Sequence, residues 1–155
     1  MITATAIEAG GKQAAAPDAL SRFRDLFNQM ASGNIGNLSE VYSNDVIFTD
    51  PFRTVRGLEA LDHYLRASYN NVIECRFEFA DSVVTDNSAC LTWRMMLRHK
   101  RIRGGAQIHV DGASHLCFRN GKVYYHRDYF DIGQLLYENL PLLGRAVRWL
   151  RKHAG

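Results

Sequence analysis

Two aspartates, Asp50 and Asp128, stand within segments that otherwise have the composition of apolar β-strands. Asp50 ends the run VIFTD, and Asp128 lies inside the run YYHRDYF. Aspartate is disfavoured in strand interiors, and a buried carboxylate without a partner is costly. Because two such acids are present in one chain, at least one of them is expected to have a functional role. The pair therefore predicts a pocket with proton-transfer or hydrogen-bonding chemistry.

Each acid also has a simpler interpretation. Asp50 precedes Pro51 and could cap a turn, as Asx residues do. Asp128 could form an ion pair with Arg127 or Arg94. His126 shares a strand face with Asp128, because alternate residues of a strand point to the same side. It could be a histidine satisfied by Asp128, or it could transfer protons itself.

The segment that starts at Gln107 alternates between an apolar face and a polar face. Gly112 and Ser114 lie in the middle of the apolar face, where small side chains would leave a cavity or mark a bulge. His109, Asp111 and His115 lie on the other face. One strand rarely supplies three metal ligands, so we predict no metal site and no cofactor. A neighbouring apolar stripe contains Trp93 and Met95 and is expected to form pocket wall or core.

Helical and strand patterns follow one another along the chain. Pro17 and Asp18 suit the start of a first helix, which Gly33 can end. A short helix is predicted at 35–42, a strand at 46–50, and a third helix after Gly57. Strands are predicted at 72–81, 88–99, 106–118 and 122–131, before terminal helical segments interrupted at Pro141. Helices followed by antiparallel strands predict an α+β class, with helices on one face of a curved sheet.

The 155 residues suit one domain, expected at 17–155 after a loose arm at 1–16. No apolar run approaches the roughly 18 residues of a membrane span, and no secretory signal is expected. Three scattered cysteines predict reduced thiols in a cytoplasmic protein. The basic loop 98–103 is interpreted as a solvated hairpin tip and the basic end of the chain as a solvated helix face. The basic loop has no interleaved aromatic residue and the basic end has only Trp149, so nucleic-acid binding is not favoured.

Three segments together resemble the nuclear transport factor 2-like, or SnoaL-like, superfamily with its cystatin-like cone. They are DVIFTDPF at 45–52, RGLEA at 56–60, and the ending NGKV…RDYFD at 120–131. The likeness covers about residues 18–138. It implies a cone-shaped α+β barrel whose helices and sheet enclose a pocket, followed by a C-terminal helix.

Two enzyme branches of this superfamily can be compared residue by residue. Asp50 matches the general base of ketosteroid isomerases, but the two oxyanion-binding positions fall on Leu26 and Ser114. Asp128 matches one acid of the Asp-Arg-Asp set of limonene-epoxide hydrolase. The remaining arginine and aspartate of that set fall on Trp93 and Met95, and its water-holding tyrosine and asparagine fall on Phe48 and Asp50. The chain thus keeps one acid of each branch and completes neither site.

The resemblance implies a pocket for an apolar steroid-, polyketide- or terpenoid-like molecule. Asp50 is expected to act as base, Asp128 as acid or hydrogen-bond donor, and His126 to orient Asp128. The alternative is a non-catalytic binding module. The outer sheet face, with Tyr125, Arg127 and Tyr129, is expected to pair two subunits. Substrate contacts are expected from seven further inner residues: Phe48, Trp93, Met95, Val110, Gly112, Ser114 and Phe130.

Overall fold

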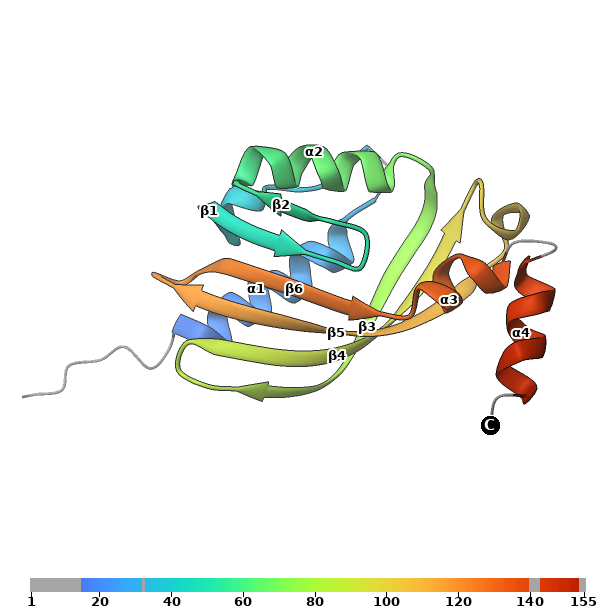
Figure 1. Ribbon diagram of the computed structural model, residues 1–155. Coiled ribbons are helices and arrows are strands. Elements are labelled where there is room, and N and C mark those ends of the chain that lie inside the picture. Colours follow the sequence, from blue (N-terminus) through green and yellow to red (C-terminus); the bar gives the residue numbers. More distant parts are fainter. Residues whose placement is uncertain (1–14, 32, 140–142, 154–155) are drawn as a thin grey trace, which may run out of the picture.

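A computed structural model of the chain describes residues 15–31, 33–139 and 143–153 (Figure 1). Helices come first and strands dominate the middle, as the sequence pattern predicted. In chain order the elements are α1 (Ala15–Gln29), η1 (Leu38–Glu40), β1 (Tyr42–Thr49), β2 (Thr54–Arg56), α2 (Leu58–Tyr69), β3 (Val72–Val84), β4 (Ser88–His99), η2 (Arg103–Gly105), β5 (Ile108–Arg119), β6 (Lys122–Phe130), α3 (Ile132–Leu135), η3 (Tyr137–Asn139) and α4 (Leu143–His153).

Within the described residues, six strands form one open sheet in the order β2-β1-β6-β5-β4-β3. Every neighbouring pair is antiparallel except β1 and β6, which run parallel. The β3–β4 register shifts twice, between Val72 and Glu74 and between Phe79 and Ser82. Such bulges bend a strand and increase its twist. The two strands accordingly curve round one end of the molecule (Figure 1).

The two longer N-terminal helices pack on the inner, concave face of this sheet. The helical spacing of Leu20, Phe23, Phe27 and Met30 is confirmed, since all four are buried. In α2 the buried residues are Leu61, Leu65 and Tyr69. Helix α1 contacts mainly β3, whereas α2 lies along β1 and β2. The space between the helices and the curved sheet is where a pocket can form.

The predicted helix at 35–42 is wrong, because only a short 3-10 turn forms at Leu38–Glu40. The Asn37 side chain accepts hydrogen bonds from the Ser39 backbone and hydroxyl, at 3.2 and 2.7 Å. Tyr42 already pairs with Val123 of β6, so strand β1 begins four residues earlier than predicted. Local side-chain capping and strand pairing thus outweigh a weak helical pattern.

The C-terminal helices α3 and α4 lie at one end of the sheet (Figure 1). Asp131 is exposed and caps α3, accepting the backbone N–H of Gly133 at 2.7 Å. The predicted interruption at Pro141 lies outside the described residues, as does the predicted arm up to residue 14. Helix α1 begins at Ala15, and the missing N–H of Pro17 costs nothing in a first turn. Among the described helices, none is long and apolar enough to cross a membrane.

Candidate functional site

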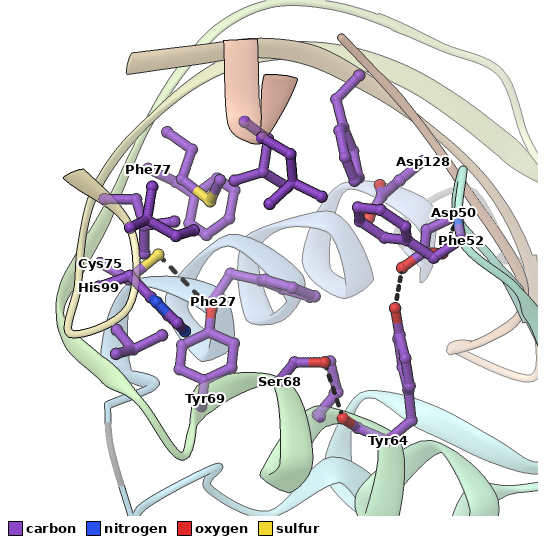
Figure 2. Close-up of a pocket in the computed structure, with 18 of the residues that line it drawn as sticks. Phe27, Asp50, Phe52, Tyr64, Ser68, Tyr69, Cys75, Phe77, His99 and Asp128 are labelled. Carbon is purple, nitrogen blue, oxygen red and sulfur yellow. Dashed lines mark hydrogen bonds between the residues drawn. The ribbon is translucent and has the colours of Figure 1, made fainter. Parts of the chain in front are cut away.

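A cavity of about 450 Å³ lies between α1, α2 and the inner face of the sheet. Its volume falls within the roughly 300–1,000 Å³ typical of small-molecule sites. Aromatic and aliphatic side chains form most of its wall, with a few polar groups at its two ends (Figure 2). A wider groove of about 900 Å³ beside α2 is lined by both polar and apolar side chains and contains neither of the strand aspartates.

Six of the residues expected at the site line this cavity: Phe48, Asp50, Trp93, Met95, Asp128 and Phe130. Four others do not line it, namely Val110, Gly112, Ser114 and His126. Ser114 and His126 instead lie behind the wall and bind Asp128 from there. Val110 is fully buried in the core. The predicted inner face is therefore correct, but only part of it reaches the cavity. The other residues lie behind the cavity wall.

Gly112 leaves no cavity, because the Trp93 indole occupies the space. A Cβ atom placed on Gly112 would come within 2.3 Å of the Trp93 ring. The pairing of β4 with β5 continues without a shift through Trp93 and Gly112, so the alternative of a bulge is also wrong. Glycine at this position leaves room for the indole, which forms part of the cavity wall.

Asp128 is held from behind by two donors. The Ser114 hydroxyl donates to Asp128 Oδ1 at 2.5 Å, and His126 Nε2 lies 2.7 Å from the same oxygen. The Trp93 indole N–H donates to Ser114 Oγ at 2.9 Å and so orients that hydroxyl. The described residues provide no donor to Asp128 Oδ2. The side chain keeps 14% of its surface exposed, on the cavity side.

His126 is fully buried and connects Asp128 to Tyr42. The Tyr42 hydroxyl lies 2.9 Å from His126 Nδ1. Burial, with the nearby Asp128 charge, raises the pKa of Tyr42 well above its usual value, so this hydroxyl keeps its proton and donates. His126 Nδ1 then accepts, and Nε2 carries the ring proton toward Asp128. The chain Tyr42–His126–Asp128 thus has every donor matched to an acceptor.

Four aromatic rings surround the His126 imidazole. Phe23, Phe27 and Phe48 approach it edge-on with centroids 5.1, 5.9 and 4.8 Å away, and the Tyr42 ring stacks at 6.0 Å. Packing on all sides leaves the imidazole one orientation. Its effect on a ligand must therefore pass through Asp128.

The hydrogen bonds of Asp50 differ from those of Asp128, since both oxygens of Asp50 accept hydrogen bonds. Oδ1 accepts the backbone N–H groups of Phe52 and Arg53 at 2.8 and 3.0 Å. This is the turn-capping role considered for Asp50 from the sequence. Oδ2 accepts a short hydrogen bond from the Tyr64 hydroxyl. Burial and this bond raise the pKa of Tyr64, so the phenol stays protonated and acts as the donor.

The parallel pairing of β1 with β6 brings the two aspartates together. Phe48 pairs with His126 and Thr49 with Arg127, so the next step of the register sets Asp50 beside Asp128. Both side chains line the same end of the cavity, with Tyr64 reaching them from α2 (Figure 2). The sequence identified both acids, while their adjacency depends on this one parallel pairing.

Polar residues that sequence reasoning missed form the opposite end of the cavity. The Tyr69 hydroxyl contacts Cys75 Sγ at 3.8 Å, and His99 lies on the same side (Figure 2). Arg101 and Ile102 also line the wall. Part of the loop 98–103 therefore faces the cavity, which corrects its interpretation as a wholly solvated tip.

Signals for some of the missed residues exist in the sequence. Tyr64 and Tyr69 lie three and four residues from the helical stripe Leu61–Leu65, so the inner face of α2 could have been extended to them. No comparable signal identifies His99 or Arg101, because their position depends on how the turn after β4 folds back toward Asn71. That fold is fixed by a backbone bond from Lys100 to Asn71 of 2.9 Å.

The positions that match the oxyanion donors of ketosteroid isomerases contribute none here. Leu26 is buried and packs near Gly36, away from the cavity lining. The hydroxyl of Ser114 is used by Asp128. On the outer face, Asp111 forms an ion pair with Arg94 at 2.7 Å.

Comparison with known proteins agrees with this architecture. A family model for SnoaL-like domains matches residues 22–126. No curated protein matches the chain.

Three solved structures with the same fold illustrate the similarity. A protein proposed to be a SnoaL-like polyketide cyclase from Jannaschia sp. CCS1 has 12% identity and a TM-score of 0.66, over 80% of this chain and 92% of that one. A hypothetical protein with a ketosteroid isomerase-like fold from Catenulispora acidiphila DSM 44928, in complex with trimethylamine, has 13% identity and a TM-score of 0.67, over 80% and 93%. An LEH-like epoxide hydrolase from M. tuberculosis has 13% identity and a TM-score of 0.63, over 77% and 86%. At such identities the likeness shows the fold alone.

Proposed function

The chain belongs to the SnoaL-like domain family, and we propose that it is an acid–base enzyme acting on an apolar steroid-, polyketide- or terpenoid-like molecule. One observation carries this proposal: an apolar cavity in which a carboxylate, Asp128, is held from behind and keeps one oxygen free of donors from the described residues. A general base needs such an oxygen within reach of the proton that it takes.

Asp128 supports the role of base better than Asp50, which the sequence had suggested. Asp50 already accepts three hydrogen bonds, and both of its oxygens are used. Asp128 accepts two on Oδ1 alone. In an isomerase-like reaction, Oδ2 of Asp128 would take a proton from the carbon beside a carbonyl and return it to another carbon. In a hydrolase-like reaction it would take a proton from water as the water oxygen bonds to an epoxide carbon and that carbon's bond to the epoxide oxygen breaks. The protonated carboxyl would then return the proton to the alkoxide, giving the diol.

His126 positions the base rather than contacting the ligand. Its Nε2–H and the Ser114 hydroxyl fix the carboxylate plane, so that Oδ2 points toward the cavity side. Fixed donors of this kind need no rearrangement during the reaction. Tyr42 in turn fixes the tautomer of His126.

A panel of apolar ketones and epoxides tests the proposal. We expect the wild-type protein to incorporate deuterium from D₂O beside the carbonyl of at least one ketone, or to open at least one epoxide to a diol. Asp128→Asn should lower that rate about 100-fold or more, as removal of a general base does. Its Oδ1 can still accept the bonds from Ser114 and His126, so ligand affinity should stay within about threefold.

Asp50→Asn is the matched control, because it removes the neighbouring carboxylate while preserving the turn. Its Oδ1 can still accept the backbone N–H groups of Phe52 and Arg53. We expect a smaller loss than for Asp128→Asn. Equal turnover by wild type and Asp128→Asn on every reactive compound would contradict the proposed role.

A second candidate is a non-catalytic binding module. It is favoured by Trp93 and Met95, which are apolar where the hydrolase branch has an arginine and an aspartate. Tyr64 is also engaged by Asp50, so it would have to break that bond to stabilise an oxyanion. A ligand that co-purifies, is identified by mass spectrometry and is not turned over would support this candidate.

A further inference from the structure

The charged groups that line the cavity are divided between its two ends. Asp50 and Asp128 lie at one end, beside Tyr64, and His99 lies across the cavity from them (Figure 2). Arg101 also lines the wall; burial and, to a smaller extent, the positive charge of Arg101 lower the pKa of His99. An elongated ligand would therefore meet a negative end and a positive end, separated by aromatic wall.

The guanidinium of Arg101 has no partner within the part of the chain that the structure describes. Among the described residues it has neither an ion pair nor a hydrogen bond. Its neighbour Arg98, in contrast, donates to the Gly105 carbonyl at 3.1 Å and lies 3.8 Å from Glu74. Within one basic loop, Arg98 stabilises the loop, whereas Arg101 is exposed and belongs to the cavity lining, where its donors can meet a ligand.

His99 adds a second donor at the same end. Its Nδ1 accepts the backbone N–H of Arg101 at 3.1 Å. In the neutral imidazole, Nε2 then carries the proton and can donate. Burial lowers the pKa of His99 from its usual value, which favours this neutral form near pH 7. A guanidinium and a neutral imidazole N–H together suit an anionic oxygen group better than an uncharged one.

We propose that the ligand carries a carboxylate, which Arg101 and His99 bind at the end of the cavity opposite Asp128. The inference rests on the proposed function, which makes the cavity a ligand site. The aspartates would repel this carboxylate, so only one orientation is favourable. In that orientation the apolar body spans the aromatic wall, and the uncharged reactive end lies next to Asp128.

Two fluorescent probes of equal shape test the inference: 1-pyrenebutyrate, which has a carboxylate, and 1-pyrenebutanol, which has a hydroxyl in its place. Their dissociation constants are measured by fluorescence anisotropy at pH 7.5. We expect wild type to prefer the butyrate about tenfold or more, in line with a charge-assisted hydrogen bond. Arg101→Gln should remove this preference by weakening the butyrate alone, and Arg101→Lys should keep part of it.

Arg103→Gln is the matched control, since Arg103 belongs to the same loop but does not line the cavity. It should change neither constant. Met95→Trp, which fills the cavity, should weaken both probes. Equal binding of the two probes to wild type, or an unchanged preference in Arg101→Gln, would overturn the inference while leaving the cavity as a ligand site. Failure of both probes to bind would overturn the proposed function as well.

Discussion

At Asp128, two donors share one carboxylate oxygen and leave the other facing an apolar cavity. The energetic reason for this arrangement is the cost of burying an unpaired carboxylate. Ser114 and His126 offset that cost without occupying Oδ2. Asp50, beside it, accepts hydrogen bonds on both oxygens, from a turn and from Tyr64. The two acids, one directly after β1 and one within β6, therefore differ in how many of their oxygens remain available to a ligand.

Replacement of Tyr42 by phenylalanine tests the buried chain that holds Asp128. The change removes the donor to His126 Nδ1 and leaves a buried acceptor unsatisfied. We expect the free energy of unfolding to fall by about 1–3 kcal/mol. Urea denaturation followed by circular dichroism measures it. Tyr129→Phe is the control, because the Tyr129 side chain is exposed and no hydrogen bond of its hydroxyl is seen among the described residues. Similar stabilities of the two variants would contradict the chain.

The buried thiol of Cys75 gives a prediction on pH. Burial raises the pKa of Cys75 to about 11, from 9.0 when exposed. A folded-state pKa above the unfolded one means that the native state binds more protons between these values. The contribution of Cys75 to stability is then complete below about pH 9 and is lost as the pH rises through about 11. Burial of Tyr42 and Tyr69 acts in the same direction at still higher pH.

Iodoacetamide labelling followed by mass spectrometry checks this difference in the native protein. At pH 8 we expect exposed Cys90 to react at least about tenfold faster than Cys75, because only the thiolate attacks. Labelling in urea should remove the difference. Equal native rates would show that Cys75 is accessible and its pKa ordinary.

At the scale of elements, the packing of β4 on β5 shows why the cavity wall at Trp93 requires a small residue at position 112. The Trp93 indole covers Gly112 and reaches Ser114, so a side chain at Gly112 would displace it. We expect Gly112→Ala to destabilise the fold by about 1–3 kcal/mol, as overpacking does. The double variant Gly112→Ala with Trp93→Phe should lose less than the sum of the two single changes. Additive losses in thermal or urea unfolding would show that the two residues do not compete for space.

Most of these elements could be predicted because their patterns are strong. The strand at 88–99 matches β4, and the alternation along 106–118 correctly separates the buried face of β5 from its polar face. The helix predicted at 35–42 failed where Asn37 caps a 3-10 turn. Strand β2 was missed because its three residues form only when Asp50 turns the chain back onto β1.

At the scale of the whole molecule, the family resemblance predicted the fold better than the site. Motifs at 45–60 and 120–131 are specific for the order of the elements, and they correctly place Asp50 and Asp128 on the inner face. These motifs say little about activity, because proteins with the same fold can have different catalytic residues. The basic end of the cavity could not be predicted, since a turn after β4 and helix α2 must meet before His99, Arg101 and Tyr69 line one space.

The outer sheet face gives a prediction about assembly. Tyr129 is 51% exposed, with the Arg127 guanidinium 4.8 Å from its ring centroid, and the His115 ring lies against Tyr125. We propose that this face pairs two copies of the chain. Sedimentation velocity at micromolar concentration should show a dimer, and Tyr129→Glu should shift it toward monomer. A wild-type monomer under these conditions would contradict the proposal.

The central claim is that the free oxygen of Asp128 performs acid–base chemistry on a ligand in the cavity. It is tested most directly by the turnover rate of Asp128→Asn on a compound that wild type converts, measured with the binding affinity for the same compound. We predict a rate at least about 100-fold lower with affinity within about threefold of wild type. An unchanged rate at unchanged affinity would contradict the claim.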